Sequence, residues 1–270
     1  MFNTPLVVVR KNQPNRSNER GIKQMKGKFV VVDGIDGVGK AKGFLDVFIE
    51  EARKEGKRIF DVHEFWKTHD YHPPLQDILA QADVLYTSEP TFAGIGRYIR
   101  EEMIFKNQRN YSPEAVAQAY ALDRHILYEQ LLLPCLQAGK DIYQSRSLST
   151  SIVYQRQSAL DQGREFSIKD ILAIPGNAFC YRHPMDHLVI PTITNVEQAL
   201  ERLAQREKDD QSKFENFEFQ LRIKPHYESQ EFKDVFESVG TTVTYLDAGQ
   251  TLDYSQQQAR EFYGEYLKEQ

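Results

Sequence analysis

The sequence predicts an α/β protein in which a central parallel sheet of five strands is covered by helices on both faces. Two observations lead to this prediction. Short apolar segments alternate with longer segments whose apolar residues recur at the helical spacing, which is the pattern of strands joined by crossover helices. The 270 residues, 40% hydrophobic and 27% charged, also suffice for one sizeable core. We therefore expect a single domain over residues 28–270 and a basic, flexible tail over residues 1–27.

The first half of the chain contains four of the expected strands. Residues 29–33 form a buried strand, and the amphipathic helix that follows it ends at Gly56, a residue typical of C-caps. Ser112 and Pro113 are a cap and a first-turn proline, so they mark the start of a long helix that Gly139 stops. The other strands expected in this half cover residues 57–62, 84–87 and 141–144, and the other helices cover residues 75–82, 92–106 and 112–138.

The second half continues the alternation. Residues 163–186 are mixed in character, with one short helix near residues 168–173. Thr194 and Glu197 are spaced as a capping box, which opens a helix that runs to about residue 206. A charged stretch then leads into one helix over residues 214–238. The remaining elements are strands at residues 187–191 and 242–246 and helices at residues 149–162 and 252–268.

Bulk composition limits the classes of function. The net charge is −5, so nucleic acid is not an expected partner of the whole chain. Cys135 and Cys180 are the two cysteines; they make no disulfide framework, which fits a reducing cytoplasm. No apolar run approaches the roughly 18 residues of a membrane span, so no membrane partner is expected. The basic tail is either a flexible or non-native start, or a segment that contacts nucleic acid or a partner.

A glycine-rich loop follows the first strand and reads G-I-D-G-V-G-K-A over residues 34–41. It matches the pattern G-x-x-x-x-G-K-[ST] up to the last position. Backbone N–H groups of such a loop surround phosphates, and Lys40 supplies a compact charge for the terminal ones, whereas Ala41 lacks the hydroxyl that normally contacts Mg²⁺. The alternative is a glycine-rich turn without a ligand. Such a loop is typical of the three-layer P-loop NTPase fold, and it predicts a nucleotide-phosphate site formed by Gly34, Ile35, Gly37, Val38, Gly39, Lys40 and Ala41.

Other polar and aromatic side chains follow strands or share helix faces. Tyr120 and Arg124 are four residues apart on one helix, where a ring can stack on a base and a guanidinium can donate hydrogen bonds to it. Arg146 directly follows the fourth strand, above the crevice in which parallel sheets bind ligands. Asp36 lies inside the phosphate loop, where it can contact a sugar hydroxyl, a substrate phosphate or a metal. Arg100, which follows the third strand, can clamp a phosphate. Solvated positions are the alternative for the helical pair, for Asp36 and for Arg100.

The combination resembles the thymidylate kinase (dTMP kinase) family. The motifs occur in that family's order and spacing, and the resemblance covers about residues 28–268. Each motif alone is weak, but the set is specific. The motifs are D-G-I-D-G-V-G-K (33–40), S-E-P (88–90), I-R-E (99–101), Y-A-L-D-R (120–124), S-R (145–146), S-I-V-Y-Q (151–155), N-V-E-Q-A-L-E-R (195–202) and K-F-E (213–215).

The resemblance implies an ATP side. The phosphate loop with Lys40 would hold the ATP phosphates, and a lid over about residues 205–215 would bring Arg206 or Lys213 to the transferring phosphoryl. Mg²⁺ would be held mostly by ATP oxygens and water, with Asp36 or Glu89 as outer partners. The implied catalytic residues are Lys40, Asp36, Arg146 and Lys213.

The resemblance also implies a dTMP side. Tyr120 would stack on thymine, Arg124 would contact a base carbonyl, and Ser151 would face the base edge. Tyr154 would lie near the deoxyribose and disfavour a ribose 2′-hydroxyl. A homodimer would form through the helices over residues 92–106 and 112–138. The implied dTMP site comprises Asp36, Glu89, Arg100, Tyr120, Arg124, Arg146, Ser151 and Tyr154, with the two arginines at 100 and 146 on the phosphate.

The chain departs from the family pattern mainly around the phosphates. Ala41, Ser88 and Ser145 replace a hydroxyl residue, an arginine and an aspartate, and Lys213 replaces an arginine in the lid motif. We expect phosphoryl transfer from ATP to dTMP, with weaker retention of magnesium. Two alternatives remain at this point: a catalytically weak nucleotide-binding relative, and a kinase for another nucleotide or a nucleoside.

Overall fold

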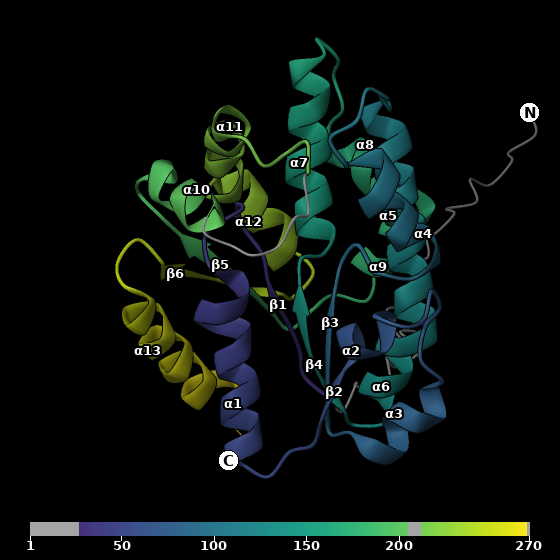
Figure 1. Cartoon of the computed structure of the whole chain (residues 1–270), viewed down its shortest axis with the longest axis vertical. Coiled ribbons are helices and arrows are strands. Elements are labelled where there is room, and N and C mark those ends of the chain that lie inside the picture. Colours follow the sequence, from purple (N-terminus) through teal and green to yellow (C-terminus); the bar gives the residue numbers. More distant parts are fainter. Residues whose placement is uncertain (1–26, 205–211, 269–270) are drawn as a thin grey trace, which may run out of the picture.

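Six parallel strands form one sheet in the order β2-β3-β4-β1-β5-β6 (Figure 1). The computed structural model describes residues 27–204 and 212–268, so residues 1–26 of the tail expected over residues 1–27 lie outside the described residues. The strands are β1 (Phe29–Val32), β2 (Ile59–Asp61), β3 (Val84–Ser88), β4 (Asp141–Ser145), β5 (His187–Thr192) and β6 (Thr242–Asp247).

The parallel α/β architecture is confirmed, but the predicted number of five strands is wrong. The sixth strand, β6, pairs with β5 from His187↔Thr242 to Thr192↔Asp247. It lies at the edge of the sheet and has a single strand neighbour. Only Val243 of this strand is fully buried, whereas all of β1 is buried. The mixed sequence of β6 is therefore that of a half-covered edge strand. The strand itself was expected at residues 242–246, so the error lies in the number of strands assigned to the sheet.

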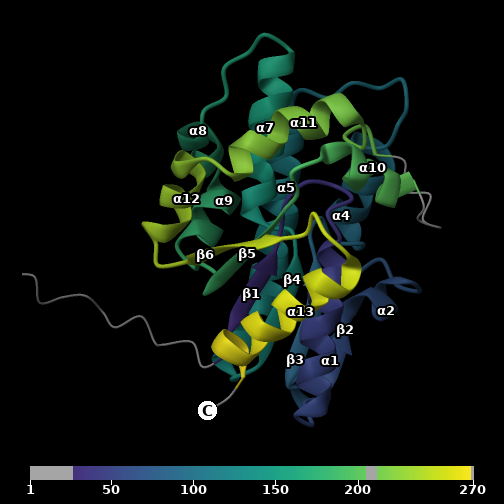
Figure 2. The same cartoon turned by 90° about the vertical axis from the view of Figure 1, so that its left-hand side faces the viewer.

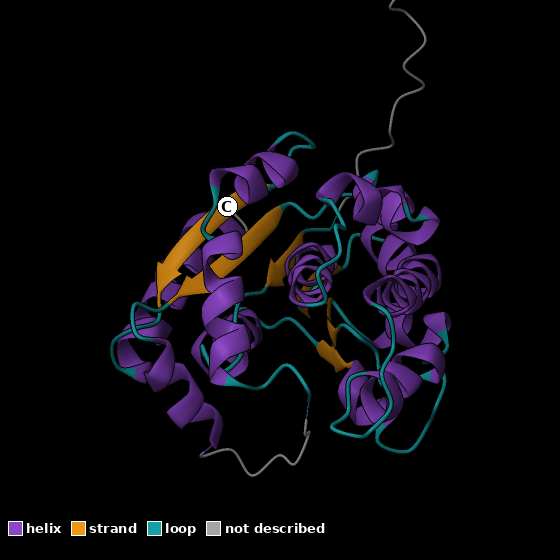
Figure 3. Ribbon diagram, turned by 90° about the horizontal axis from the view of Figure 1, so that it is seen from above, coloured by secondary structure: helices purple, strands orange, loops and turns teal. Residues whose placement is uncertain are grey.

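Helices cover both faces of this sheet, as predicted. The strands run between two groups of helices when the molecule is viewed from above (Figure 3). The helices are α1 (Asp46–Lys54), α2 (Val62–Trp66), α3 (Leu75–Gln81), α4 (Gly94–Tyr98), α5 (Pro113–Leu127), α6 (Leu133–Gln137), α7 (Leu148–Asp161), α8 (Ile168–Ala173), α9 (Pro175–Tyr181), α10 (Val196–Ala204), α11 (Phe217–Tyr227), α12 (Gln230–Glu237) and α13 (Leu252–Phe262), with π-helical turns η1 (Lys40–Leu45), η2 (Ile99–Met103), η3 (Tyr128–Leu132) and η4 (Tyr263–Leu267).

Aromatic side chains join the layers. Helices α1 and α13 lie side by side on one face, and α3, α5, α6 and α9 lie on the other (Figures 1 and 2). The ring of Phe48 on α1 is 5.6 Å from that of Phe262 and 5.9 Å from that of Tyr143. On the opposite face, Phe29 packs edge-on against Tyr128, with ring centroids 5.8 Å apart. Burial of such rings supplies much of the hydrophobic stabilisation of a core.

The long helix predicted over residues 112–138 is continuous but not uniform. The Ser112 side chain accepts a hydrogen bond from the Ala115 N–H at 3.2 Å, and Pro113 occupies the first turn, as predicted. The π-helical turn η3 then joins α5 to α6. Pro134, which has no N–H to donate, lies in the first turn of α6, directly after that π-helical turn.

Three local predictions are wrong. The helix predicted over residues 214–238 is two helices, because Ser229 caps α12 by accepting a hydrogen bond from the Phe232 N–H. Residues 163–186 contain two helices, α8 and α9, rather than one. The cap of α10 is Asn195 instead of Thr194, since the Glu197 N–H donates to the Asn195 side chain at 2.8 Å. Among the described residues, no helix combines the length and the apolar character needed to cross a membrane.

Candidate active site

The phosphate loop connects β1 to the turn η1. Gly37 and Gly39 have φ angles of 79° and 88°, in the left-handed region that glycine tolerates. Gly37 has a second reason to be glycine, because a Cβ there would lie 1.9 Å from the Ala199 carbonyl oxygen of α10. The Lys40 Nζ donates to the carbonyl oxygens of Gly34 at 3.0 Å and Ile35 at 2.8 Å. The loop is therefore a compact turn onto which its lysine folds back.

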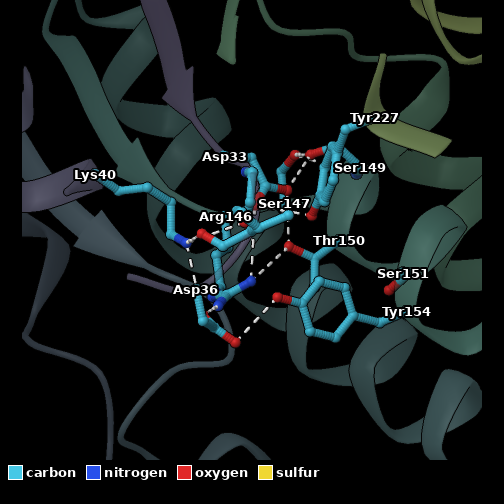
Figure 4. A network of polar contacts seen from close by, with 12 residues as sticks. Asp33, Asp36, Lys40, Arg146, Ser147, Ser149, Thr150, Ser151, Tyr154 and Tyr227 are labelled. Carbon is cyan, nitrogen blue, oxygen red and sulfur yellow. Dashed lines mark hydrogen bonds and ion pairs between the residues drawn. The ribbon is translucent and has the colours of Figure 1, made fainter. Parts of the chain in front are cut away.

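Asp36 and Arg146 meet next to this lysine (Figure 4). The Arg146 Nη2 donates to Asp36 Oδ1, and the Lys40 Nζ is 3.6 Å from the same oxygen. Tyr154 donates its hydroxyl to Asp36 Oδ2 at 3.0 Å, and burial raises the pKa of Tyr154 well above its usual value, so the hydroxyl keeps its proton. Arg146 itself has a φ of 65°, an uncommon conformation for a residue with a side chain. The structure brings together three of the four predicted catalytic residues.

Asp33, to which sequence reasoning gave no role, fixes the base of the loop. Its Oδ2 accepts hydrogen bonds from Ser149 at 2.5 Å and Thr150 at 2.7 Å, and its Oδ1 accepts from the Gly34 N–H at 2.8 Å and the Tyr227 hydroxyl at 3.2 Å (Figure 4). The carboxylate is fully buried. It follows β1 directly and joins the first strand to α7 and α11. The carboxylate after a buried strand is a signal that could have identified it.

Arg124 lies at the deep end of the site and is entirely buried. Its Nε donates to Glu89 Oε2 at 2.7 Å, and its Nη2 donates to the Ser151 hydroxyl at 3.0 Å. The Asn177 side chain and the Ser147 carbonyl oxygen accept its other hydrogen bonds. Sequence reasoning assigned this arginine to a base carbonyl. The structure shows it as the centre of a protein network that also holds Ser151.

Burial raises the pKa of Glu89 to about 7, and the charge of Arg124 opposes that shift. The Gln144 amide donates to Glu89 Oε1 at 3.1 Å, so both carboxylate oxygens contact protein groups. The next residues are also anchored, because Asp123 on α5 accepts hydrogen bonds from the Thr91 N–H and hydroxyl at 2.8 Å and 2.7 Å. The turn after β3 is thus held against α5.

Tyr120 and Arg100 lie on the same side of the sheet as Arg124. Tyr120 packs in a small apolar cluster with Ile99, Met103 and Val116, and 5% of its surface is exposed. The Arg100 Nε donates to the Pro90 carbonyl oxygen at 2.9 Å, and its guanidinium carbon is 3.8 Å from the centroid of the Phe92 ring. The described conformation therefore directs Arg100 onto the turn that follows β3.

A cavity of 560 Å³ opens between α5, α7 and the chain around residue 213. Gln155 is 1% exposed, and neither its amide nitrogen nor its amide oxygen has a hydrogen-bond partner among the described residues. The buried hydroxyl of Ser158, one turn further along α7, also lacks a partner there. An unpaired buried amide is costly, so these groups indicate a polar ligand. The cavity is lined by Met103, Asn110, Tyr111, Ser112, Pro113, Val116, Gln155, Ser158, Gln162, Lys213 and Phe214.

Sequence reasoning gave no role to Gln155, although it ends one of the motifs. The signal was present, because residues 151, 155 and 158 share a helix face by their spacing of four and three. Ser151 on that face is engaged by Arg124, and the next two polar residues are left for a ligand.

Lys213 does not join the other three predicted catalytic residues. Its Nζ donates to the carbonyl oxygens of Met103 at 3.0 Å and Arg109 at 2.7 Å, and its backbone N–H donates to Ile104 at 2.7 Å. The end of the predicted lid is therefore joined to the loop that precedes α5. Arg206 and most of the lid, residues 205–211, lie outside the described residues.

The three departures near the phosphates leave few oxygen ligands. Ala41 is exposed in the first turn after the loop. The Ser88 hydroxyl is hydrogen-bonded to His63 Nε2, with 2.8 Å between the two atoms. Within residues 27–204 and 212–268, no group of three acidic, histidine or cysteine residues could enclose a metal ion. The Asp36 carboxylate lies 3.6 Å from the Lys40 Nζ. This donor set fits a magnesium ion whose ligands come mostly from a nucleotide and water, with Asp36 as a protein partner.

Comparisons with known proteins place the chain among nucleotide kinases. Residues 74–258 match the model of the family described as thymidylate kinase. The probable thymidylate kinase of Pyrococcus abyssi is 30% identical over 211 residues, which cover 75% of this chain and 82% of the relative. The thymidylate kinase of Limosilactobacillus reuteri is 27% identical over 234 residues, which cover 85% of this chain and 92% of the relative. The chain belongs to the thymidylate kinase family.

Proposed function

We propose that this chain transfers the γ-phosphoryl group of ATP to dTMP and releases dTDP and ADP. One observation supports this most strongly: Asp36 connects the two parts of the site. Its Oδ1 is shared by Lys40 and Arg146, and its Oδ2 contacts Tyr154. The Tyr154 ring is 5.5 Å from that of Phe214, which lines the cavity. A phosphate-loop lysine and a nucleoside-sized cavity are thus joined through a single carboxylate.

In this proposal a phosphate oxygen of dTMP attacks the γ-phosphorus of ATP in line. The bond between that phosphorus and the β–γ bridging oxygen breaks, and ADP leaves with the bond electrons. The protein positions both nucleotides and neutralises charge. Lys40 and Arg146 exchange their present acceptors for phosphate oxygens, and Arg100 neutralises the dTMP phosphate. Bound Mg²⁺ would offset the phosphate charge, with Asp36 as its nearest protein partner.

The base and sugar are read by the cavity side of the site. We propose that Gln155 supplies one donor and one acceptor to the base edge, since its amide has no partner among the described residues. Tyr120, which packs against the cavity-lining residues Met103 and Val116, stacks on the base, and Arg124 keeps Ser151 in place. Tyr154 contacts the sugar and disfavours a 2′-hydroxyl. The role proposed for Arg124 is therefore to hold Ser151 in position.

Release of ADP in the presence of different acceptors tests the proposal. We expect dTMP to give the fastest ATP-dependent release among dTMP, dUMP, dCMP, dGMP and thymidine. Lys40→Ala is the matched inactive control. A faster reaction with another acceptor would reassign the substrate. Release no faster than that of Lys40→Ala with every acceptor would instead favour a nucleotide-binding relative.

We further propose that phosphoryl transfer requires Mg²⁺ bound with ATP, and that the chain forms a homodimer in the cytoplasm. The two cysteines, Cys135 and Cys180, are buried and free, which fits a reducing compartment. The family resemblance supports a dimer through the helices within residues 92–106 and 112–138. Light scattering at increasing protein concentration would measure the mass of the particle, and a constant monomer mass would contradict the dimer.

A further inference from the structure

Gln220 of α11 contacts the phosphate loop from outside the site described so far. It is fully buried, and its amide has three partners. Its Oε1 accepts a hydrogen bond from the Asp36 N–H at 2.7 Å. Its Nε2 donates to Asp36 Oδ2 at 3.0 Å and to the Phe214 carbonyl oxygen at 2.8 Å. One amide therefore holds both the backbone and the side chain of Asp36 and joins them to the end of the predicted lid segment.

These contacts determine which way the Asp36 carboxylate faces. Gln220 and Tyr154 both donate to Oδ2, which leaves Oδ1 for Arg146 and Lys40. If the donation from Gln220 is lost, one of the two hydrogen bonds that fix this orientation is lost with it. The buried Asp36 N–H also loses its acceptor. Unpaired buried donors are costly, so the Asp36 peptide group would shift to find another partner.

The helix that carries Gln220 supports the loop at a second point. Tyr227, at the other end of α11, donates its hydroxyl to Asp33 Oδ1 at 3.2 Å (Figure 4). Asp33 and Asp36 flank the start of the phosphate loop, and each is held by one side chain of α11. The loop is therefore positioned by α11, whose Gln220 lies 184 residues after Asp36 in the chain, as well as by its own strand β1.

We propose that Gln220 is a positioning residue for phosphoryl transfer. It fixes the orientation in which Asp36 presents Oδ1 to Lys40 and Arg146, and it makes that orientation depend on the position of Phe214. It touches neither substrate and acts only through Asp36. The inference rests on the proposed function, in which Asp36 joins the phosphate loop to the acceptor cavity.

Steady-state kinetics of two Gln220 variants test this. Gln220→Leu removes every polar contact, whereas Gln220→Glu keeps an acceptor for the Asp36 N–H but faces Asp36 with a second carboxylate. We expect both to lower kcat/KM for dTMP by about tenfold to a hundredfold, because small displacements of reacting groups have effects of that order. The KM for ATP should change less than about twofold in both.

Gln157→Leu is the matched control. Gln157 is also a buried glutamine with side-chain partners, Asp161 at 2.7 Å and His226 at 3.0 Å, but it lies away from the loop. We expect its kinetics to match those of the wild type. The double variant Asp36→Asn/Gln220→Leu should lose no more than Asp36→Asn alone, since Gln220 acts through that carboxylate.

Equal kinetics for Gln157→Leu and both Gln220 variants would overturn the inference, as would additive losses in the double variant. Calorimetric binding of dTMP separates this failure from failure of the proposed function. A wild type that binds dTMP without phosphorylating it overturns the proposed function alone, and weaker dTMP binding by Gln220→Glu then still supports the role of Gln220. Unchanged binding by that variant overturns it.

Discussion

The phosphate end and the base end of this site are prepared for ligands in opposite ways. At the phosphate end, every charged group that the structure brings together has a partner: Arg146 pairs with Asp36, and Lys40 bonds to loop carbonyl oxygens. At the base end, the Gln155 amide is buried and has no partner among the described residues. Binding at the first end exchanges existing contacts, whereas binding at the second creates new ones.

This difference separates catalysis from recognition. Exchange of one ion pair for another contributes little net affinity, so the phosphate end is suited to stabilise charge that changes during the reaction. A preformed, unpaired amide gains hydrogen bonds only with a matching base, so the base end is suited to discriminate between ligands. Variants at the phosphate end should thus mainly lower kcat, and variants at the base end should mainly raise KM for the acceptor.

Lys40→Met should have the largest effect. The variant removes the one cation that sits inside the loop, and we expect kcat to fall by about 10²- to 10³-fold, the usual range for a lost group at a developing charge. Binding of dTMP, measured by calorimetry, should stay within about threefold of the wild type because the base end is untouched. A large loss of dTMP affinity would show that the two ends are not separable.

Arg146→Met comes next. Arg146 pairs with Asp36 and lies over the Tyr154 ring, with its guanidinium carbon 5.2 Å from the ring centroid. Loss of a charge-assisted contact to the acceptor phosphate should lower kcat/KM for dTMP by about a hundredfold. The variant also leaves Asp36 without its strongest partner, so Asp36→Asn/Arg146→Met should lose less than the two single losses combined. Additive losses would contradict the coupling.

Gln155→Leu removes the polar group of the base end and leaves the phosphate end unchanged. We expect the KM for dTMP to rise about tenfold while kcat changes little, because the base loses one donor and one acceptor. The free energy of unfolding without ligand should rise by about 1 kcal/mol, since a buried unpaired amide is replaced by an apolar group. Urea unfolding measures that gain. A less stable variant would mean that the amide has a partner in the free protein.

Glu89, the partner of Arg124, should make both stability and activity depend on pH. Burial raises its pKa from the usual 4.5 to about 7. As pH falls through 7, Glu89 therefore takes up a proton in the folded protein, whereas in the unfolded chain it does so only near pH 4.5. Protonation of Glu89 thus contributes to the free energy of unfolding at low pH, and this contribution is lost as pH rises through 7. A neutral Glu89 holds Arg124 less firmly, and kcat/KM for dTMP should drop below pH 7. Glu89→Gln should remove that step from the pH profile.

Ala41→Ser should have the smallest effect. The substitution restores a hydroxyl where the phosphate-loop pattern has one, and position 41 is exposed. We expect turnover to rise a few-fold at limiting Mg²⁺ and to change little at saturating Mg²⁺. An unchanged magnesium requirement would contradict the idea that the missing hydroxyl weakens metal retention.

Local signals in the sequence predicted most of the fold. Gly56 ends its helix with a φ of 82°, and Pro113 starts another, because each residue favours one backbone state. The strand at residues 242–246 was expected, but its pairing with β5 at the edge of the sheet joins distant segments, so the predicted sheet was one strand short. The break at Ser229 was missed because residues 214–238 keep a helical pattern on both sides of the cap.

The site was harder to predict than the fold. Lys40, Asp36 and Arg146 follow strands β1 and β4, which are neighbours in the sheet, so topology alone brings them together. Gln220 and Tyr227 reach the loop from 180 to 200 residues away, and no local pattern marks such contacts. The position of Lys213 depends on the pairing of Phe105 with Ser212, which is also a contact between distant segments.

Chromatographic separation of the nucleotides formed from ATP and dTMP shows directly whether the chain phosphorylates dTMP. We expect equal amounts of dTDP and ADP from the wild-type protein, in a reaction that needs Mg²⁺ and is nearly abolished in Lys40→Ala. ADP formed without dTDP, or dTDP formed equally by Lys40→Ala, would contradict the proposed function.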